Sequence, residues 1–326
     1  MHDAPHSPTL YMRDARRNPT DAYAFERRAA FVSVVTGTIL LVIKFVAYFI
    51  TGSAAVFSDA LESIVNVLAS LFALYAVILA HAPADREHPY GHGKVEFLSA
   101  GFEGGLILAA ALVILVRAIE QLLRGPEIEQ LDAGLTLVAA AMLVNAAVGF
   151  FLIRSGQRHG SIALEADGKH LLSDAVTSLV VLVALAIYWI TKWKWIDPLA
   201  ALLVAGYIAL LGAGLLRRSA AGLMDEQDVE DDRLLRQILD SHVGAAGKEP
   251  RICSYHKLRH RHSGRYHWVD FHMMVPADWG IDRAHQAGSA IEYEIEQAIG
   301  EGKATAHVEP WTAASGDCAW CGSTGG

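Results

Sequence analysis

Six predominantly apolar stretches, each about twenty residues long or longer, constrain the fold of this chain more than any other feature. They lie near residues 29–51, 54–80, 97–122, 133–153, 162–190 and 198–216. A helix needs roughly 20 apolar residues to cross the hydrocarbon core of a bilayer, and a backbone inside lipid must satisfy its own hydrogen bonds. The sequence therefore predicts six membrane-spanning helices.

Composition and helix-ending residues support this prediction. Hydrophobic residues form 53% of the chain and charged residues 19%, against roughly 45–50% and about 25% in an ordinary soluble domain. Thr-Gly-Ser at 51–53, His-Ala-Pro at 81–83, Gly125-Pro126 and Asp197-Pro198 all fall between the apolar stretches, where helices should end or begin. The net charge of −8 leaves no overall basic surface for phosphate backbones and argues against nucleic acid as a partner.

Basic residues beside the spans predict their orientation. One side has Arg13, Arg16, Arg17, Arg27, Arg28, Arg86, Lys94, Arg154, Arg158, Lys169, Arg217 and Arg218, and the other has Arg124, Lys192 and Lys194. Because the side richer in Lys and Arg faces the cytoplasm, this bias predicts that both termini are cytoplasmic. The start MHDAPHSPTL lacks a charged segment followed by an apolar one, so we expect no cleaved signal peptide.

The last third of the chain is typical of a small soluble domain. Leucine and isoleucine spacing predicts helices near 228–243 and 283–299, and alternation predicts two strands within 252–275 and a third at 304–308. The expected architecture is an all-α six-helix transmembrane domain followed by an α+β domain of order α-β-β-α-β. The expected division is an N-terminal tail (1–28), the spans (29–218), the α+β domain (219–311) and a Gly/Ser-rich tail (312–326).

Ionisable residues in two of the spans predict a metal site. Asp59, Glu62 and Asn66 lie on one face of the second span, and His170 and Asp174 lie four residues apart in the fifth. Two helices that each offer a pair of N or O ligands can close a four-ligand site for a divalent cation. A hydrogen-bonded contact that only holds the helices together is the alternative, at a large desolvation cost for packing alone.

Three other polar residues occur singly in the spans. They are Lys44 in the first span, Glu103 in the third and Asn145 in the fourth. We expect interhelical contacts or snorkelling for them.

The loop between the second and third spans contains Asp85, His88 and His92, at spacings of three and four. Such a set suits a divalent metal with an open coordination position. Taken alone, a polar connecting loop with two surface histidines is the simpler interpretation.

The soluble domain is rich in histidine. Seven histidines lie between His256 and His307. On a regular strand His256, His260 and His262 share a face, and His272 and His285 could converge with His307 and Glu309 on a metal. Solvated histidines on a strand are the alternative. Cys318 and Cys321 have the spacing of half a zinc site or a redox pair, but with only one further cysteine, Cys253, we favour a reactive tail.

Several motifs together resemble the cation diffusion facilitator family, in particular its bacterial zinc and ferrous-iron efflux members. They are Gly52-Ser-Ala-Ala, Ser58-Asp-Ala-Leu-Glu-Ser, Pro83-Ala-Asp85 with His88, Gly91-His92-Gly93-Lys94, and Ala166-Asp-Gly-Lys-His170-Leu-Leu-Ser-Asp174. The similarity extends from about Ala29 to Pro310.

The resemblance implies a homodimer in the inner (plasma) membrane, in which each protomer exports a divalent metal against protons by alternating access. Zinc and iron(II) are the foremost substrates implied, with manganese, cobalt, nickel and cadmium as further candidates. The soluble domain would be a metallochaperone-like fold that binds metal and joins the protomers. A charge interlock between Lys94 and Asp225 would lie near the hinge between the two domains.

Carried over by position, the resemblance assigns the transport ligands to His170 and Asp174. Glu62 and Asn66 stand where well-known zinc exporters have two aspartates, which leaves the metal open, and Asp59 is a further candidate ligand. The domain ligands correspond to His256, His272, His285, His307 and, in place of an aspartate, Glu309.

The residues themselves are consistent with proton exchange. Glutamate, aspartate and histidine can each take up a proton when a metal leaves. The sequence has no G-x-x-x-x-G-K-[ST] motif for ATP, and no nucleophile and base are placed together as in an enzyme. A membrane-anchored metal sensor and a passive metal channel are the rival functions.

Overall fold

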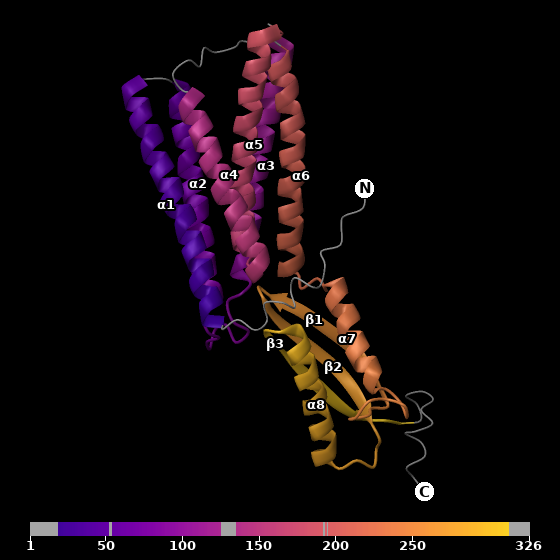
Figure 1. Cartoon of the computed structure of the whole chain (residues 1–326). Helices are drawn as coiled ribbons and strands as arrows, with labels where there is room; N and C mark the ends of the chain where they lie inside the picture. The colour runs from indigo at the N-terminus through magenta and orange to yellow at the C-terminus, as the bar shows by residue number, and fades with distance from the viewer. Residues whose placement is uncertain (1–18, 52–53, 125–134, 192, 194, 313–326) are drawn as a thin grey trace. The chain divides into compact units, whose positions relative to one another are not determined.

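The computed structural model describes residues 19–51, 54–124, 135–191, 193 and 195–312. It divides into two compact units, one ending at Leu223 and the other beginning at Met224 (Figure 1). Each unit is described by itself.

The first unit is a bundle of long helices. They are α1 (Pro19–Thr51), α2 (Ala54–Ala80), α3 (Val95–Arg124), α4 (Leu135–His159), α5 (Ile162–Thr191) and α6 (Ile196–Leu223). Among the described residues, five stretches are long and apolar enough to cross a membrane, and they lie in α1, α2, α3, α4 and α6. Helix α5 is also of spanning length, with 30 residues, and large apolar side chains such as Leu123 and Leu203 are exposed as lipid contact requires. The predicted helical membrane domain is confirmed.

Small residues bring the helices together in pairs. Helix α3 packs along α6, and α4 packs along α5. A Cβ added at Gly104 would lie 3.1 Å from the carbonyl oxygen of Gly212, and one added at Gly168 would lie 2.7 Å from that of Gly149. Such close backbone approach is how helices associate where lipid provides no hydrophobic driving force.

We expect Gly168→Leu to destabilise the bundle. The new side chain would have to displace the backbone of α4, because the first added carbon already lies 2.7 Å from the amide nitrogen of Ile153. Overpacking of this kind costs about 1–3 kcal/mol. The melting temperature of the purified protein in detergent measures the effect, and Gly206→Leu is the control because a Cβ there meets nothing within 4 Å. Equal melting temperatures for the two variants would contradict the close packing of α4 and α5.

The second unit has the predicted α-β-β-α-β order. It consists of α7 (Val229–His242), β1 (Ser254–Ser263), β2 (Tyr266–Val275), α8 (Ile281–Ile299) and β3 (Gly302–Pro310). The sheet has the order β1-β2-β3, with β1 antiparallel and β3 parallel to β2.

Both helices cover one face of this sheet. Val269, Phe271, Met273 and Val275 alternate along β2 and are buried, and Leu235 of α7 and Ile291 of α8 belong to the same core. We call this the covered face. The intervening residues of β2, including Asp270 and His272, point to the opposite face, which we call the open face.

Strand β1 contains a bulge that corrects one prediction from the sequence. His256 pairs with His272 on the open face, but the register shifts before Arg259, so His260 pairs with the buried Val269. Lys257 accommodates the extra residue with a φ of 50°. A bulge adds one residue to one strand and reverses the alternation beyond it. The prediction that His256, His260 and His262 share a face is therefore wrong.

Candidate metal sites

A polar group connects α2 and α5 inside the helical bundle. The amide nitrogen Nδ2 of Asn66 donates a hydrogen bond of 2.6 Å to Oδ2 of Asp174. Nε2 of His170 lies 3.0 Å from Oδ1 of Asn66, and 4.0 Å from Oδ2 of Asp174. His170 is only 5% exposed. The structure thus brings together three of the four predicted transport ligands, one from α2 and two from successive turns of α5. We call Asn66, His170 and Asp174 the Asn66 group.

Two predicted ligands of α2 cannot be placed in this group. Asp59 and Glu62 belong to the helix, but their side chains lie outside the described residues. Their membership of the site stays a prediction.

Glu103 of α3 is a neighbour of His170, whereas the sequence analysis treated it as a single polar residue with an interhelical contact or snorkelling. Its side chain is fully buried, and its Oε2 lies 3.9 Å from Nδ1 of His170. Within the described part of the chain neither of its carboxylate oxygens has a hydrogen-bond partner. The sequence did contain a signal for this contact, which is equal depth in the membrane. Glu103 and His170 each lie eight residues after the starts of α3 and α5, and these two helices run in the same direction (Figure 1).

A serine-linked carboxylate lies one turn before His170. Oγ of Ser70 donates to Oδ1 of the fully buried Asp167 over 2.9 Å, and Oγ of Ser33 lies 3.0 Å from Oγ of Ser70. This chain of hydrogen bonds connects α1, α2 and α5. In the described part of the chain it provides a partner for one carboxylate oxygen of Asp167, while Oδ2 of Asp167 has none.

The loop between α2 and α3 brings Asp85, His88 and His92 together. Nδ1 of His88 lies 3.2 Å from Oδ1 of Asp85, and Nε2 of His92 lies 3.4 Å from Oδ2. The backbone N–H groups of His88 and Glu87 also donate to Asp85, and these bonds lower the pKa of its carboxyl, with that from His88 the strongest. One carboxylate and two imidazoles therefore converge, as a divalent metal requires.

A second group of ligands lies on the open face of the C-terminal sheet. His272 is opposite both His256 and His307 in register. Oε1 of Glu309 lies 2.7 Å from Nδ1 of His272 and 3.6 Å from Nε2 of His307, and Oε2 lies 3.4 Å from Nε2 of His256. The hydrogen bond from His272 is the main cause of a lowered pKa of the Glu309 carboxyl. We call His256, His272 and Glu309, which converge most closely, the open-face cluster.

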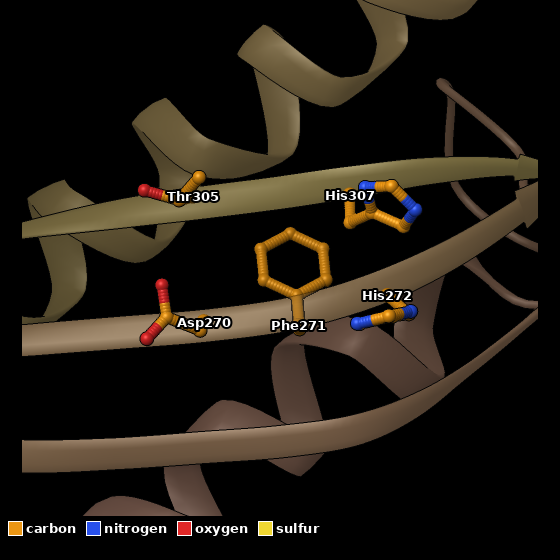
Figure 2. A pocket seen from close by; sticks show the side chains of 5 residues that line it. All are labelled: Asp270, Phe271, His272, Thr305 and His307. Carbon is orange, nitrogen blue, oxygen red and sulfur yellow. The ribbon is translucent and has the colours of Figure 1, made fainter.

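A shallow hollow lies beside the open-face cluster. Figure 2 shows Asp270 and His272 of β2 next to Thr305 and His307 of β3. Together with Phe271 they line a cavity of about 380 Å³.

The remaining predictions concern His285, the pair of Lys94 and Asp225, and the two cysteines of the tail. His285 is exposed near the start of α8 and is not a member of the open-face cluster. Nζ of Lys94 lies 3.4 Å from the carbonyl oxygen of Leu223, and Oδ2 of Asp225 lies 3.4 Å from a guanidinium nitrogen of Arg261. Lys94 and Asp225 belong to different units, so their charge interlock stays a prediction. Cys318 and Cys321 lie outside the described residues.

Taken together, the membrane-spanning helices and the Asn66 group define a multi-pass membrane protein with side chains of the kind that bind divalent cations. Residues 30–224 match the family profile described as the cation efflux transmembrane domain, and residues 238–311 match that of the cation efflux protein cytoplasmic domain. The chain belongs to the cation efflux family, the cation diffusion facilitators. It is a transporter of divalent metals and not an enzyme, which confirms the expectation from the sequence.

Individual relatives agree with this assignment. An uncharacterized transporter of Synechocystis is 39% identical over 87% of this chain and 90% of its own length. The cation-efflux pump FieF of Shewanella oneidensis is 30% identical over 89% of this chain and 96% of its own. A solved structure titled for the putative zinc transporter CzrB is 27% identical and covers 26% of this chain and 99% of its own, with a TM-score of 0.24, too low to inform the fold.

Proposed function

We propose that this protein is a proton-coupled antiporter that exports zinc and iron(II) from the cytoplasm across the inner (plasma) membrane by alternating access. The observation that supports this most is the convergence of Asn66, His170 and Asp174 inside the helical bundle. Ionisable residues at membrane depth mark ion pathways, because burying them for packing alone is costly. The similarity to a cation-efflux pump over nearly the whole chain points in the same direction.

Proton coupling follows from the chemistry of the ligands. A metal binds the neutral imidazole of His170 and the ionised carboxylate of Asp174, and both groups lose metal affinity when they take up a proton. The same atoms therefore serve metal and proton in turn. Glu62 and Asp59 are proposed as further carboxylates of the site, and both termini are proposed to lie in the cytoplasm.

The C-terminal domain is proposed to bind metal at the open-face cluster and to join two protomers. The match to the cytoplasmic domain of the family supports a homodimer. His307, His285 and the loop group of Asp85 are proposed as additional metal ligands. Lys94 and Asp225 are proposed to pair near the hinge, where a partly buried ion pair has more effect than an exposed one.

Proteoliposomes test the antiport directly. Metal added to one side should move protons in the opposite direction, and an imposed pH gradient should drive metal uptake, measured with trapped pH and metal dyes. Zinc, iron(II), manganese, cobalt, nickel and cadmium are compared. Metal flux that does not depend on the pH gradient would indicate a passive channel, and the absence of any metal flux would favour a sensor.

A further inference from the structure

A second group of metal-type ligands lies on the covered face of the C-terminal sheet, at its hairpin end. His262 of β1 is directly opposite His267 of β2, and their ring centroids are 4.1 Å apart. Asp231, in the first turn of α7, lies over them. The bulge in β1 makes this arrangement possible, because it turns His260 and His262 away from the open face.

Both imidazoles are aimed at one carboxylate oxygen. Oδ2 of Asp231 lies 2.9 Å from Nε2 of His262 and 3.2 Å from Nδ1 of His267. In a tetrahedral zinc site with bonds of about 2.0–2.1 Å, neighbouring ligand atoms are about 3.3 Å apart. Both distances from the carboxylate oxygen are thus close to the separation that a zinc ion needs, and all three ligand atoms lie within 4.8 Å of one another.

The surroundings of these ligands are shielded but reachable. The side chains of His262 and Asp231 are 27% and 23% exposed, and that of His267 is 11% exposed. His260, two residues before His262 on the same face, is 5% exposed. In the described part of the chain, its Nε2 has no hydrogen-bond partner, although buried polar atoms are normally paired.

Electrostatics favour a cation at this position. Burial raises the pKa of the Asp231 carboxyl, but hydrogen bonds from His262 and His267 outweigh burial and hold it well below its usual value. Asp228 and Asp232 add negative charge near His260.

We propose that Asp231, His262 and His267 form a divalent-metal site of the zinc type, separate from the open-face cluster and on the opposite face of the sheet. Two imidazoles and one carboxylate leave a fourth coordination position open in a tetrahedral site. The site goes beyond the transport function, because its ligands belong to the C-terminal domain alone.

The location of the site gives it a structural role. A bound metal would fix the first turn of α7 to the β1–β2 hairpin. Helix α7 follows the last membrane helix after only residues 224–228, and within that link Asp225 is already paired with Arg261 of β1. Metal at Asp231 would therefore fix the start of the C-terminal domain to its sheet.

Zinc stoichiometry tests the site in the purified full-length protein. After equilibrium dialysis against zinc, the double variant His262→Gln/His267→Gln should bind one zinc ion fewer per protomer than wild type. Asp231→Asn should weaken binding at the same site, whereas Glu230→Gln, which alters an exposed carboxylate of the same helical turn, is the matched control and should keep the wild-type number. An unchanged zinc number in the double variant would overturn the proposal.

A second measurement leaves the three proposed ligands unchanged, so it remains valid if the double variant fails to fold. Carbethoxylation of histidines, followed by mass spectrometry, reports the accessibility of each imidazole nitrogen. Zinc should slow labelling of His262 and His267 in wild type, in His272→Gln, which disrupts the open-face cluster, and in Asp174→Ala, which lacks the proposed transport ligand. Labelling rates unaffected by zinc would rule the site out, whatever the outcome of the transport assay.

Discussion

Asp174→Ala should reduce metal transport by more than about 100-fold. Asp174 accepts the 2.6 Å hydrogen bond from Asn66 and lies one turn from His170, so the variant loses a ligand and a proton acceptor together. Changing a residue that merely supports a metal ligand costs roughly 10–100-fold in affinity or activity, and a direct ligand should cost more. Zinc uptake into proteoliposomes driven by a pH gradient measures the effect.

The matched control is Glu120→Ala. Glu120 is also a carboxylate on a spanning helix, but it is exposed and pairs with Arg124 four residues later. It should transport as wild type, and both variants should remain folded. Full transport by Asp174→Ala would show that the Asn66 group is not part of the transport pathway.

Asn66→Asp should tighten zinc binding by about tenfold, which is about 1.4 kcal/mol, and make it more dependent on pH. With Glu62 as the proposed fourth ligand beside His170 and Asp174, the site has a formal charge of −2, and an aspartate at position 66 would make it −3. A carboxylate is a stronger zinc ligand than an amide oxygen and can exchange a proton. Titration of zinc and iron(II) into wild type and Asn66→Asp at two pH values measures both effects.

The same comparison tests metal selectivity. The amide of Asn66 is a hard and weak ligand, so wild type should discriminate less between zinc, iron(II), cobalt and manganese than the variant does. Asn66→Gln is a control that keeps the amide and adds no charge. Identical affinities and identical pH slopes for wild type and Asn66→Asp would show that position 66 does not coordinate metal.

The architecture could be predicted from the sequence because its signals are local. Apolar stretches of about twenty residues give the spans, and the spacing of Leu234, Leu235, Ile238 and Leu239 gives the first helix of the C-terminal domain. His170 and Asp174 were found for the same reason, since a spacing of four residues places two side chains on one side of a helix.

Contacts between elements could not be predicted in the same way. Glu103 looked like an isolated carboxylate, and only the packing of α3 beside α5 brings it to His170. Asp231 is one of three acidic residues in the first turn of α7, and nothing in the sequence distinguishes it from Glu230. The strand register determines which face of the sheet each histidine reaches, because one bulged residue in β1 lies between His256 and His260.

That bulge also makes the length of β1 indispensable. Removing one residue between His256 and Arg259 would restore regular pleating and exchange the faces of everything on one side of the deletion. Either His256 would turn away from the open-face cluster, or His260 and His262 would turn away from the covered face, where they pair with Val269 and His267. A deletion or insertion at this point would therefore change which side chains reach each face of the sheet, whereas a substitution that keeps the bulge would leave the register unchanged.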